Sequence, residues 1–487
     1  MNKIRLFSIA VAIAFSGINS YAGGLLTNTN QNIAFLRNPA RDAAIGIDGI
    51  YTNPAGVAFL SEGWHLSLNW QYAHQTRTIV TAYGPLFSMN ANNPAPISED
   101  GFAYRKFKGV ADAPVIPSIQ AAYNKGRWSF QGGIAVSGGG GKCEFEHGLG
   151  SFEGIMANMA NLLGMTGYTM DSYMRGKQFY IGFSLGAAYK VTDNLSVFGG
   201  ARMLYGTAKY EGFIDNMKVS GPATGNQLVD ATIVFGNLKD QAANAAEQYA
   251  ALGMAEQAAE YAAQAQQMGV YEEVTKGIYL DCSQKGIGIA PFIGVDWKVG
   301  RLNLAAKFDF KTRMRLKNSN PDQRFATIAA AVPSLTKYVD GQTVAEDSPA
   351  LLTFGAQYEI TDRWRVMAGY HRFFDVDTKQ YYGNTLGDSQ EVNFGTEYDI
   401  TDKIQVSAGL QKTMYDMEDD FMNDTAFNVS SYTFGLGAGV KVAPKVKINV
   451  AYFQTNYDTK NVTTGSTIKN SYTRTNRVFG LGCDIDF

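Results

Sequence analysis

Four segments between residues 351 and 414 alternate apolar and polar side chains with a period of two. In the first segment Leu352 and Phe354 face one way, whereas Thr353 and Gln357 face the other. A period of two sustained over about ten residues is typical of a β-strand. The second face is charged and rich in glycine, so it does not form a second packed core. The strands have one apolar face and one polar face, with short turns at one end and long loops at the other. This combination predicts a transmembrane β-barrel.

The start of the chain has the features of a secretory signal peptide. Lys3 and Arg5 precede an apolar run over residues 6–15, and Ser20-Tyr21-Ala22 forms a small-x-small cleavage site. The apolar run is too short to cross a bilayer as a helix. We therefore assign residues 1–22 to a signal peptide and exclude them from the fold.

Composition excludes several classes of protein. The chain has 42 Lys and Arg against 44 Asp and Glu, so it lacks the basic excess of a nucleic-acid-binding protein. No later apolar run approaches the ~20 residues that a membrane-spanning helix requires. Glycine accounts for 52 of 487 residues, above its ordinary share of ~7%. A secreted chain rich in glycine and aromatic residues fits an outer-membrane barrel better than a soluble enzyme.

The alternating segments predict fourteen antiparallel strands between residues 64 and 487, an even number as bacterial barrels require. They cover about 64–78, 115–123, 127–136, 178–189, 195–210, 286–297, 302–313, the four segments within 351–414, 432–442, 446–458 and 474–487. With both ends in the periplasm, every short turn is periplasmic and every long loop is external. Aromatic residues beside the short turns form an interfacial girdle. They are Tyr123, Trp128, Tyr189, Trp297, Tyr358, Trp364 and Tyr398.

Residues 23–63 precede the first strand without a sustained strand period. They contain Ile45, Ile47 and Ile50, too much apolar character for a disordered leader. Large barrels often fill their lumen, so we expect a compact plug, or hatch, inside the barrel that occupies residues 64–487. The turn-forming triplet Asn53-Pro54-Ala55 is its candidate motif.

Two long external loops, 211–284 and 314–348, carry helical patterns. A tract of strong helix formers from Leu238 to Met268 predicts one amphipathic helix in the first. In the second, apolar residues recur at helical spacing. We expect a hydrophobic capture surface on these helices, with simple loop packing as the alternative. Its candidate residues are Tyr249, Leu252, Phe325, Ile328, Val332 and Leu335. Residues 151–163 also have helical spacing.

The three cysteines show no metal-site spacing. Cys143 and Cys282 fall in predicted external loops in an oxidising compartment, so one hypothesis is a disulfide that ties these loops. This leaves Cys483 free on the lipid face; the alternative is three free thiols. The four histidines are scattered, and we interpret them as solvated or lumen-lining side chains. We expect no metal ion, no cofactor and no catalytic residues.

These features together resemble the FadL/TodX family of outer-membrane transporters of long-chain fatty acids and other hydrophobic compounds. The resemblance covers essentially the mature chain. It rests on a plug of about forty residues with Asn53-Pro54-Ala55, fourteen strands, and long helical third and fourth external loops. It implies passive uptake of hydrophobic small molecules, such as long-chain fatty acids, aromatic hydrocarbons or related lipids, across the outer membrane of a Gram-negative cell.

The resemblance also implies a third strand that bends inward beside the plug and leaves a lateral window in the wall. Gly132 and Gly133 interrupt this strand, and Gly138 to Gly141 follow at its outer end. Glycine inside a strand often marks a bulge or a kink. We take Gly132 and Gly133 as the candidate kink and lateral exit, with ordinary barrel glycine as the alternative.

Enzyme motifs are absent from the sequence. The glycines of residues 435–439 lie on the lumen face of a strand and lack the strand-to-helix context of a dinucleotide loop. No serine nucleophile elbow is present. The expected partners are a hydrophobic small molecule, outer-membrane lipid and lipopolysaccharide, without nucleic acid, and the chain is expected to be a monomer. The main rival function is a surface-exposed structural or adhesin protein that binds external partners through its long loops.

Overall fold

The computed structural model describes residues 26–27, 31–331, 333–379, 387–419, 422–424 and 427–487. The predicted signal peptide, residues 1–22, lies outside this range. None of the helices in the described ranges is both long enough and apolar enough to cross a membrane.

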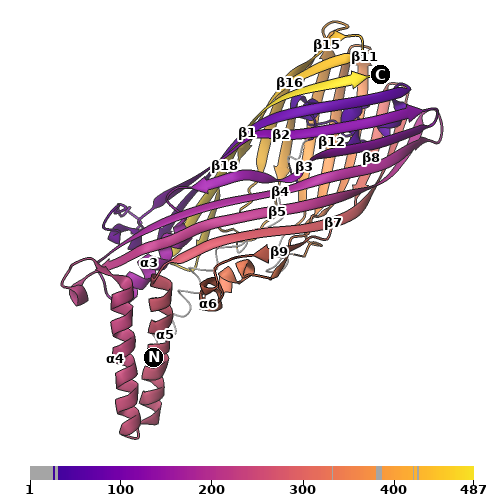
Figure 1. Cartoon of the computed structure of the whole chain (residues 1–487). Helices are drawn as coiled ribbons and strands as arrows, with labels where there is room; N and C mark the ends of the chain where they lie inside the picture. Colours follow the sequence, from indigo (N-terminus) through magenta and orange to yellow (C-terminus); the bar gives the residue numbers. More distant parts are fainter. Residues whose placement is uncertain (1–25, 28–30, 332, 380–386, 420–421, 425–426) are drawn as a thin grey trace.

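Fourteen long strands of the described chain form a closed antiparallel barrel (Figure 1). Each strand pairs with the next long strand, and β18 pairs back with β1 to close the barrel. The strands are β1 (Gly63–Tyr83), β2 (Arg105–Lys125), β3 (Trp128–Phe145), β4 (Gly167–Lys190), β5 (Leu195–Ser220), β7 (Ile278–Val299), β8 (Leu302–Asp309), β11 (Ala350–Thr361), β12 (Trp364–Phe374), β13 (Ser389–Asp399), β14 (Ile404–Met414), β15 (Ser431–Ala443), β16 (Val446–Tyr457) and β18 (Ile468–Asp486). The predicted fourteen-stranded barrel is confirmed.

The barrel is much longer on one side than on the other. Strand β5 has 26 residues, whereas β12 has 11. Four short strands extend the sheet at the end opposite the short turns: β6 (Val229–Asp230), β9 (Arg315–Ser319), β10 (Thr343–Ala345) and β17 (Lys460–Thr464). The early strands were predicted to end too soon, because their outer parts carry charged instead of apolar residues on the outward face. Lys177 of β4 and Glu211 of β5 are examples.

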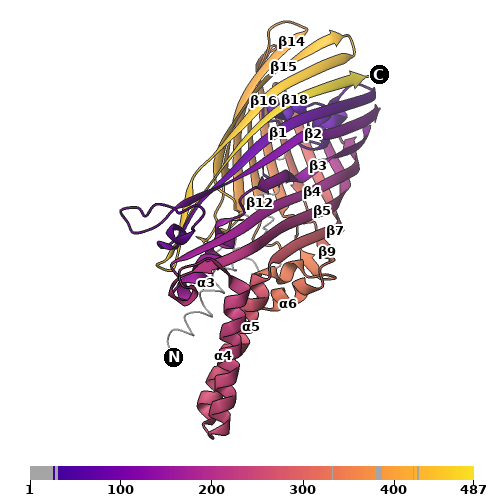
Figure 2. The same ribbon diagram turned by 60° about the vertical axis from the view of Figure 1, so that its left-hand side comes forward.

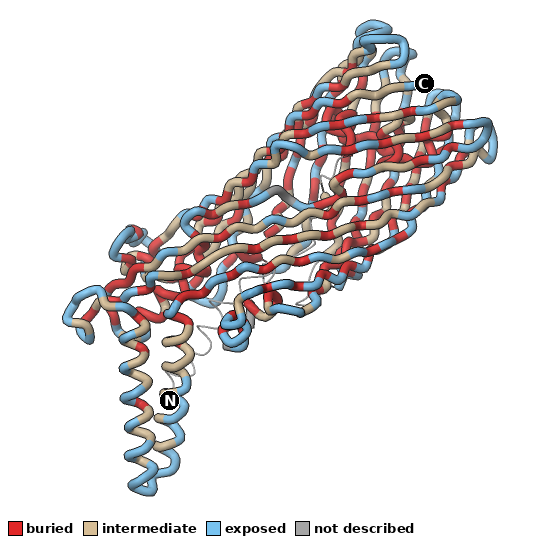
Figure 3. Tube along the Cα trace, in the orientation of Figure 1, coloured by how far each residue is buried: buried red, intermediate tan, exposed pale blue. Residues whose placement is uncertain are grey.

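Buried and exposed residues alternate along the strands (Figure 3). On β4, Leu185 is 72% exposed on the outer face, while Ser184 beside it faces the lumen and is buried. Aromatic side chains gather at the short-turn end, where Trp64 lies 4.9 Å from Tyr123 and Trp128 lies 4.8 Å from Tyr189 between ring centroids. Such a band of amphipathic rings is typical of a membrane interface.

Helices lie at the other end of the barrel (Figures 1 and 2). Helix α3 spans Gly150–Leu162, while α4 (Ala231–Ala251) and α5 (Ala255–Thr275) form a hairpin that projects away from the barrel. The single helix predicted from Leu238 to Met268 is therefore wrong. The chain reverses at Gly253, whose φ of 74° lies in the left-handed region that glycine adopts without a steric penalty.

The external loop between β8 and β11 contains α6 (Arg324–Ala331), followed by the 3-10 helix η5 (Pro333–Tyr338). A proline disfavours helical geometry in the residue before it and has no N–H group to continue the helix. The apolar pattern predicted one helix through Leu335. Because of Pro333, this stretch instead forms two elements, α6 and η5. Val332 lies outside the described residues.

Cys143 lies on β3 and Cys282 on β7, and neither lies in a loop. Strands β4 and β5 separate them. Three strand spacings amount to ~14 Å, whereas the Cα atoms of a disulfide lie within about 7 Å. The disulfide hypothesis is wrong, and all three cysteines are free.

The topology makes a direct prediction about which side of the membrane each turn occupies. In intact cells, single cysteines introduced at Asp193, Asp362 or Asp402 in the short turns should not react with a membrane-impermeant thiol reagent. A cysteine at Ala259, on the exposed hairpin, should react. The measurement is labelling before and after cell lysis in a background that lacks the native cysteines. Labelling of the turn sites in unbroken cells would contradict this orientation.

Candidate functional site

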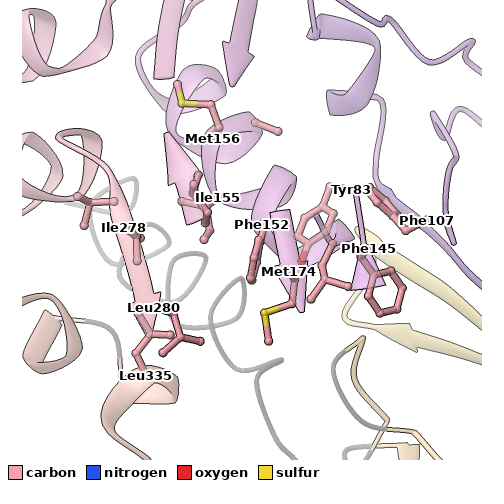
Figure 4. Close-up of a cluster of buried hydrophobic side chains, with 14 of the residues drawn as sticks. Tyr83, Phe107, Phe145, Phe152, Ile155, Met156, Met174, Ile278, Leu280 and Leu335 are labelled. Carbon is pink, nitrogen blue, oxygen red and sulfur yellow. The ribbon is translucent and has the colours of Figure 1, made fainter. Parts of the chain in front are cut away.

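An apolar cavity lies at the outer end of the barrel, beneath the external helices (Figure 4). Its volume is about 20 Å3. Its walls come from α3, β4, β5, β7 and η5. The lining residues are Phe152, Ile155, Met174, Gly212, Phe213, Ile214, Ile278, Leu280 and Leu335. A space of this size holds roughly one water molecule, so a larger guest must displace side chains such as the flexible thioether of Met174.

Helix α3 is fixed over the cavity by close packing and by one buried carboxylate. A Cβ added to Gly154 would lie 2.5 Å from the ring of Tyr83, so α3 approaches β1 closely only with glycine there. Glu153 lies 3.0 Å from Arg105 and accepts hydrogen bonds from Asn90 and Tyr168, both at 2.9 Å. Burial raises the pKa of the Glu153 carboxyl, and these partners offset that effect.

The predicted capture residues lie in three different environments. Leu335 lines the cavity. Phe325 and Ile328 are buried in the same apolar cluster without lining it. Tyr249 stacks on Tyr261 across the hairpin, with centroids 5.2 Å apart, and Leu252 at the hairpin tip is 71% exposed. The structure thus brings one of the predicted residues to the cavity.

Most cavity residues were not predicted from the sequence. Phe152 and Ile155 belong to the segment recognised as helical, and their spacing of three on an external helix was the available signal. Met174, Leu280 and the other strand residues had no such signal, because their strands had been expected to end before this level.

Residues 31–62, named here the luminal segment, pack against the inner wall of the barrel. They contain α2 (Ile33–Arg37) and two 3-10 helices, η1 (Ile47–Ile50) and η2 (Gly56–Phe59). Glycines on the lumen face of the later strands leave room for this segment. A Cβ at Gly355 or Gly435 would collide with its backbone. The glycine-rich face of these strands therefore contacts protein.

Buried ion pairs connect the luminal segment to strands β12 and β13. Arg41 pairs with Asp48 within the segment and donates to Glu397 of β13 at 2.6 Å. His371 of β12 lies 2.9 Å from both Asp42 and Glu391. Removing one partner of a buried ion pair costs about 3–5 kcal/mol. These contacts therefore hold the segment in place.

The Asn53-Pro54-Ala55 triplet connects the luminal segment to three strands on the opposite side. The side-chain amide of Asn53 donates to Asp296 of β7 at 2.5 Å. The carbonyl of Pro54 accepts from Gln131 of β3 at 2.7 Å, and that of Ala55 accepts from Ser196 of β5 at 2.6 Å. These three partners were not predicted, because their spacing in sequence carries no sign of the contact.

Pairing between β2 and β3 is interrupted in one place. Asp112 pairs with Lys142 and Ser118 pairs with Ala135, but the residues between them, 113–117 and 136–141, do not pair with each other. Strand β2 carries Pro114 and Pro117 here, which lack N–H donors, and β3 is shifted in register against β4 on its other side. The wall has a gap in its hydrogen bonding at this point.

The predicted kink at Gly132 and Gly133 is not where the interruption lies. Both glycines pair regularly with β2 and with β4. The interruption begins three residues later and includes Gly138 to Gly141, because the prolines of β2 lie opposite that stretch. On the lumen side, Gln31 lies across the gap, accepting at its carbonyl from Ser118 of β2 and donating from Nε2 to Ser137 of β3 at 3.2 Å.

Removal of Arg41 should loosen the luminal segment. Arg41→Gln leaves the buried carboxylate of Asp48 without its ion-pair partner, at a cost of about 3–5 kcal/mol. We expect higher ion conductance through single barrels in planar bilayers. The control is Arg363→Gln, which breaks an exposed pair with Asp402 and is expected to leave conductance unchanged. Equal conductance of Arg41→Gln and the unaltered barrel would contradict the role given to these contacts.

Comparisons with known proteins agree with this architecture. A family model described as "Outer membrane protein beta-barrel domain" matches residues 298–487. A search of curated proteins finds no match. A Pseudomonas aeruginosa FadL homologue is similar in structure, with a TM-score of 0.60 and 15% identity over 95% of this chain and 100% of that chain. The P. putida toluene transporter TodX has a TM-score of 0.52 and 14% identity over 91% of this chain and 94% of that chain.

At these identities the structural likeness establishes the fold. It agrees with the family model, which independently identifies the second half of the barrel as an outer-membrane domain. The resemblance indicated by the sequence is confirmed at this level: the chain is an outer-membrane β-barrel with the fold of the FadL/TodX family.

Proposed function

We propose that this barrel mediates passive uptake of hydrophobic small molecules across the outer membrane. The observation that carries the proposal is the external cavity, whose lining residues are all apolar or glycine. Apolar surface removed from water contributes roughly 25 cal/mol per Å2, so such a cavity favours a hydrophobic guest over a sugar or an ion. The candidate substrates are long-chain fatty acids, aromatic hydrocarbons and related lipids.

The luminal segment acts as a plug in this scheme. A straight aqueous path would offer a hydrophobic solute no favourable surroundings, and the segment fills the lumen with packed and ion-paired residues. The guest therefore moves from the external cavity towards the wall. Ala113 and Ile116 of β2, within the unpaired stretch, pack against the apolar cluster of α2 and offer it an apolar surface.

Release is lateral, through the gap between β2 and β3. The gap lies beside the luminal segment, and Gln31 covers it from inside. A small displacement of Gln31 removes two hydrogen bonds and opens the wall towards the bilayer. A hydrophobic solute that leaves there avoids the aqueous periplasm, which favours this route over exit along the axis.

Similar proteins support transport over catalysis. One neighbour in structure, TodX, is named a toluene transporter, and a mutant of it is named a monoaromatic hydrocarbon channel. We propose that this chain is likewise a transporter and not an enzyme.

The projecting hairpin α4–α5 favours a second candidate function, attachment to an external partner as a surface structural or adhesin protein. The hairpin contributes no residue to the cavity, and its tip is exposed. The test compares cells with and without the barrel for uptake of a radiolabelled long-chain fatty acid, toluene and a disaccharide. Faster uptake of a hydrophobic compound alone supports transport. If all three compounds enter both kinds of cell equally, and cells without the barrel no longer adhere, the result supports attachment to an external partner.

A further inference from the structure

The outer wall of the barrel has a groove over strands β3, β4 and β5, which lie side by side (Figure 1). Its volume is about 640 Å3, within the range of ligand sites, ~300–1,000 Å3. Ile134 and Val136 form one side, and Phe179, Ile181 and Phe183 form the other. These β4 residues alternate with the lumen-facing Tyr180 and Gly182, so the groove opens towards the bilayer.

The groove lies beside the irregular part of β3. Its β3 side ends at Val136, and β3 is displaced in register against β4 between Val136 and Gly138. Regular strands with large outward residues would fill such a depression. The outer side of the wall therefore has an apolar recess beside the gap in pairing.

A row of lysines crosses the wall at the outer end of the groove. Lys177 and Lys209 lie at its rim and are directly opposite each other on β4 and β5. On the adjoining strands, Lys285 of β7 is directly opposite Lys317 of β9. Like charges in opposite positions destabilise a sheet. Lys209 pairs with Asp281, but no ion pair in the described part of the chain involves Lys177, Lys285 or Lys317.

This row lies at the height of the outer lipid headgroups. Lys177 is twelve residues along β4 from Tyr189, which belongs to the aromatic girdle at the other interface. A strand that rises ~3.3 Å per residue and tilts by ~40° covers about 30 Å of membrane thickness in that distance. Lys285 and Trp297 on β7 have the same separation. The apolar groove below the lysines therefore lies in the outer half of the hydrocarbon layer.

We propose that this groove and lysine row form a binding site for one phosphate-bearing, acylated lipid of the outer leaflet, such as lipopolysaccharide. Its phosphate lies against Lys177 and Lys285, beside the Lys209–Asp281 pair, and one acyl chain fills the recess along Ile181 and Phe183. The two lysines that form no ion pair among the described residues recognise the anion, and the uncharged recess recognises the chain. The site does not depend on the proposed transport.

The test uses the full-length barrel in phosphatidylcholine vesicles that contain lipid A, its dephosphorylated form or oleate. Native mass spectrometry counts the lipid retained after the barrel is released. We compare Lys177→Gln/Lys285→Gln with Lys190→Gln/Lys298→Gln, a control pair on the same two strands at the periplasmic end. A lysine near an anionic surface contributes about a factor of five in affinity, so the first pair should bind lipid A roughly 30-fold more weakly.

Ile181→Trp fills the recess without changing the charge, and it should also reduce retention of lipid A. It tests the site independently if the lysine variant assembles poorly. Retention of lipid A by the unaltered barrel and by the control, with loss in the other variants, supports the site. The proposal is overturned if dephosphorylated lipid A is retained equally well, or if both lysine pairs lose lipid equally. Displacement of lipid A by oleate would also overturn it, because the groove would then be a site for a transported acid.

Discussion

Uptake of hydrophobic substrate by the Leu280→Asp/Leu335→Asp variant should have an apparent affinity about 100-fold lower than that of the unaltered barrel. Both leucines line the external cavity. Both side chains are already buried, so the loss comes from the new charges. An apolar guest that covers two carboxyl groups without offering them a hydrogen bond costs roughly 3 kcal/mol in total, or a factor of ~100. The measurement is the concentration dependence of initial uptake of a labelled fatty acid or monoaromatic compound.

The matched control places the same charges on the hairpin. Ile233 and Leu252 are 58% and 71% exposed, and neither lines the cavity, so Ile233→Asp/Leu252→Asp should transport like the unaltered barrel. Heat-modifiable migration in gels shows whether each variant has assembled. Normal uptake by an assembled cavity variant, or an equal defect in the hairpin variant, would remove the cavity from the pathway.

Tying Gln31 to Ser137 across the wall gap should reduce uptake to the level of cells without the barrel. Cysteines at both positions, in a background without native cysteines, are joined by a short bifunctional thiol reagent that a reductant cleaves. The side chains are 3.2 Å apart at their hydrogen bond, within reach of such a reagent. With Gln31 fixed to β3, the proposed exit remains covered. Addition of reductant should restore uptake.

The control joins the next residue of the luminal segment to a regular part of the wall. Asn32 donates to Ser67 of β1 at 3.0 Å, in a regularly paired part of the wall, and the Asn32→Cys/Ser67→Cys pair takes the same reagent. This link should leave most uptake intact. Uptake that continues through the Gln31–Ser137 link would mean that substrate leaves elsewhere. Equal block by both links would mean that the whole segment must move and that the wall gap is not the exit.

The barrel was predictable because its signal is local. Alternation such as Leu352, Phe354 and Tyr358 on one face depends only on which residues meet lipid, and each strand carries it independently. Beyond the membrane the signal is lost, since outward residues such as Lys177 and Glu211 are charged there. The outer extensions of β1 to β7, and the cavity they form, were therefore missed.

The position of the wall gap was not predictable, because it depends on the pairing of two strands. Gly132 and Gly133 were a reasonable local signal for a kink, yet both pair regularly. The interruption arises where Pro114 and Pro117 of β2 lie opposite the glycines that follow Val136 on β3. Only the register between β2 and β3 reveals that juxtaposition.

Passive transport requires that the barrel alone carries a hydrophobic solute across a bilayer. This is measured as flux of toluene or a fatty acid, and of a disaccharide, into vesicles that contain only lipid and purified protein, without an energy source. We expect the barrel to accelerate entry of the hydrophobic solute, with saturation at high concentration. The disaccharide should enter no faster than in protein-free vesicles. Equal acceleration of both solutes, or of neither, would contradict the proposed transport.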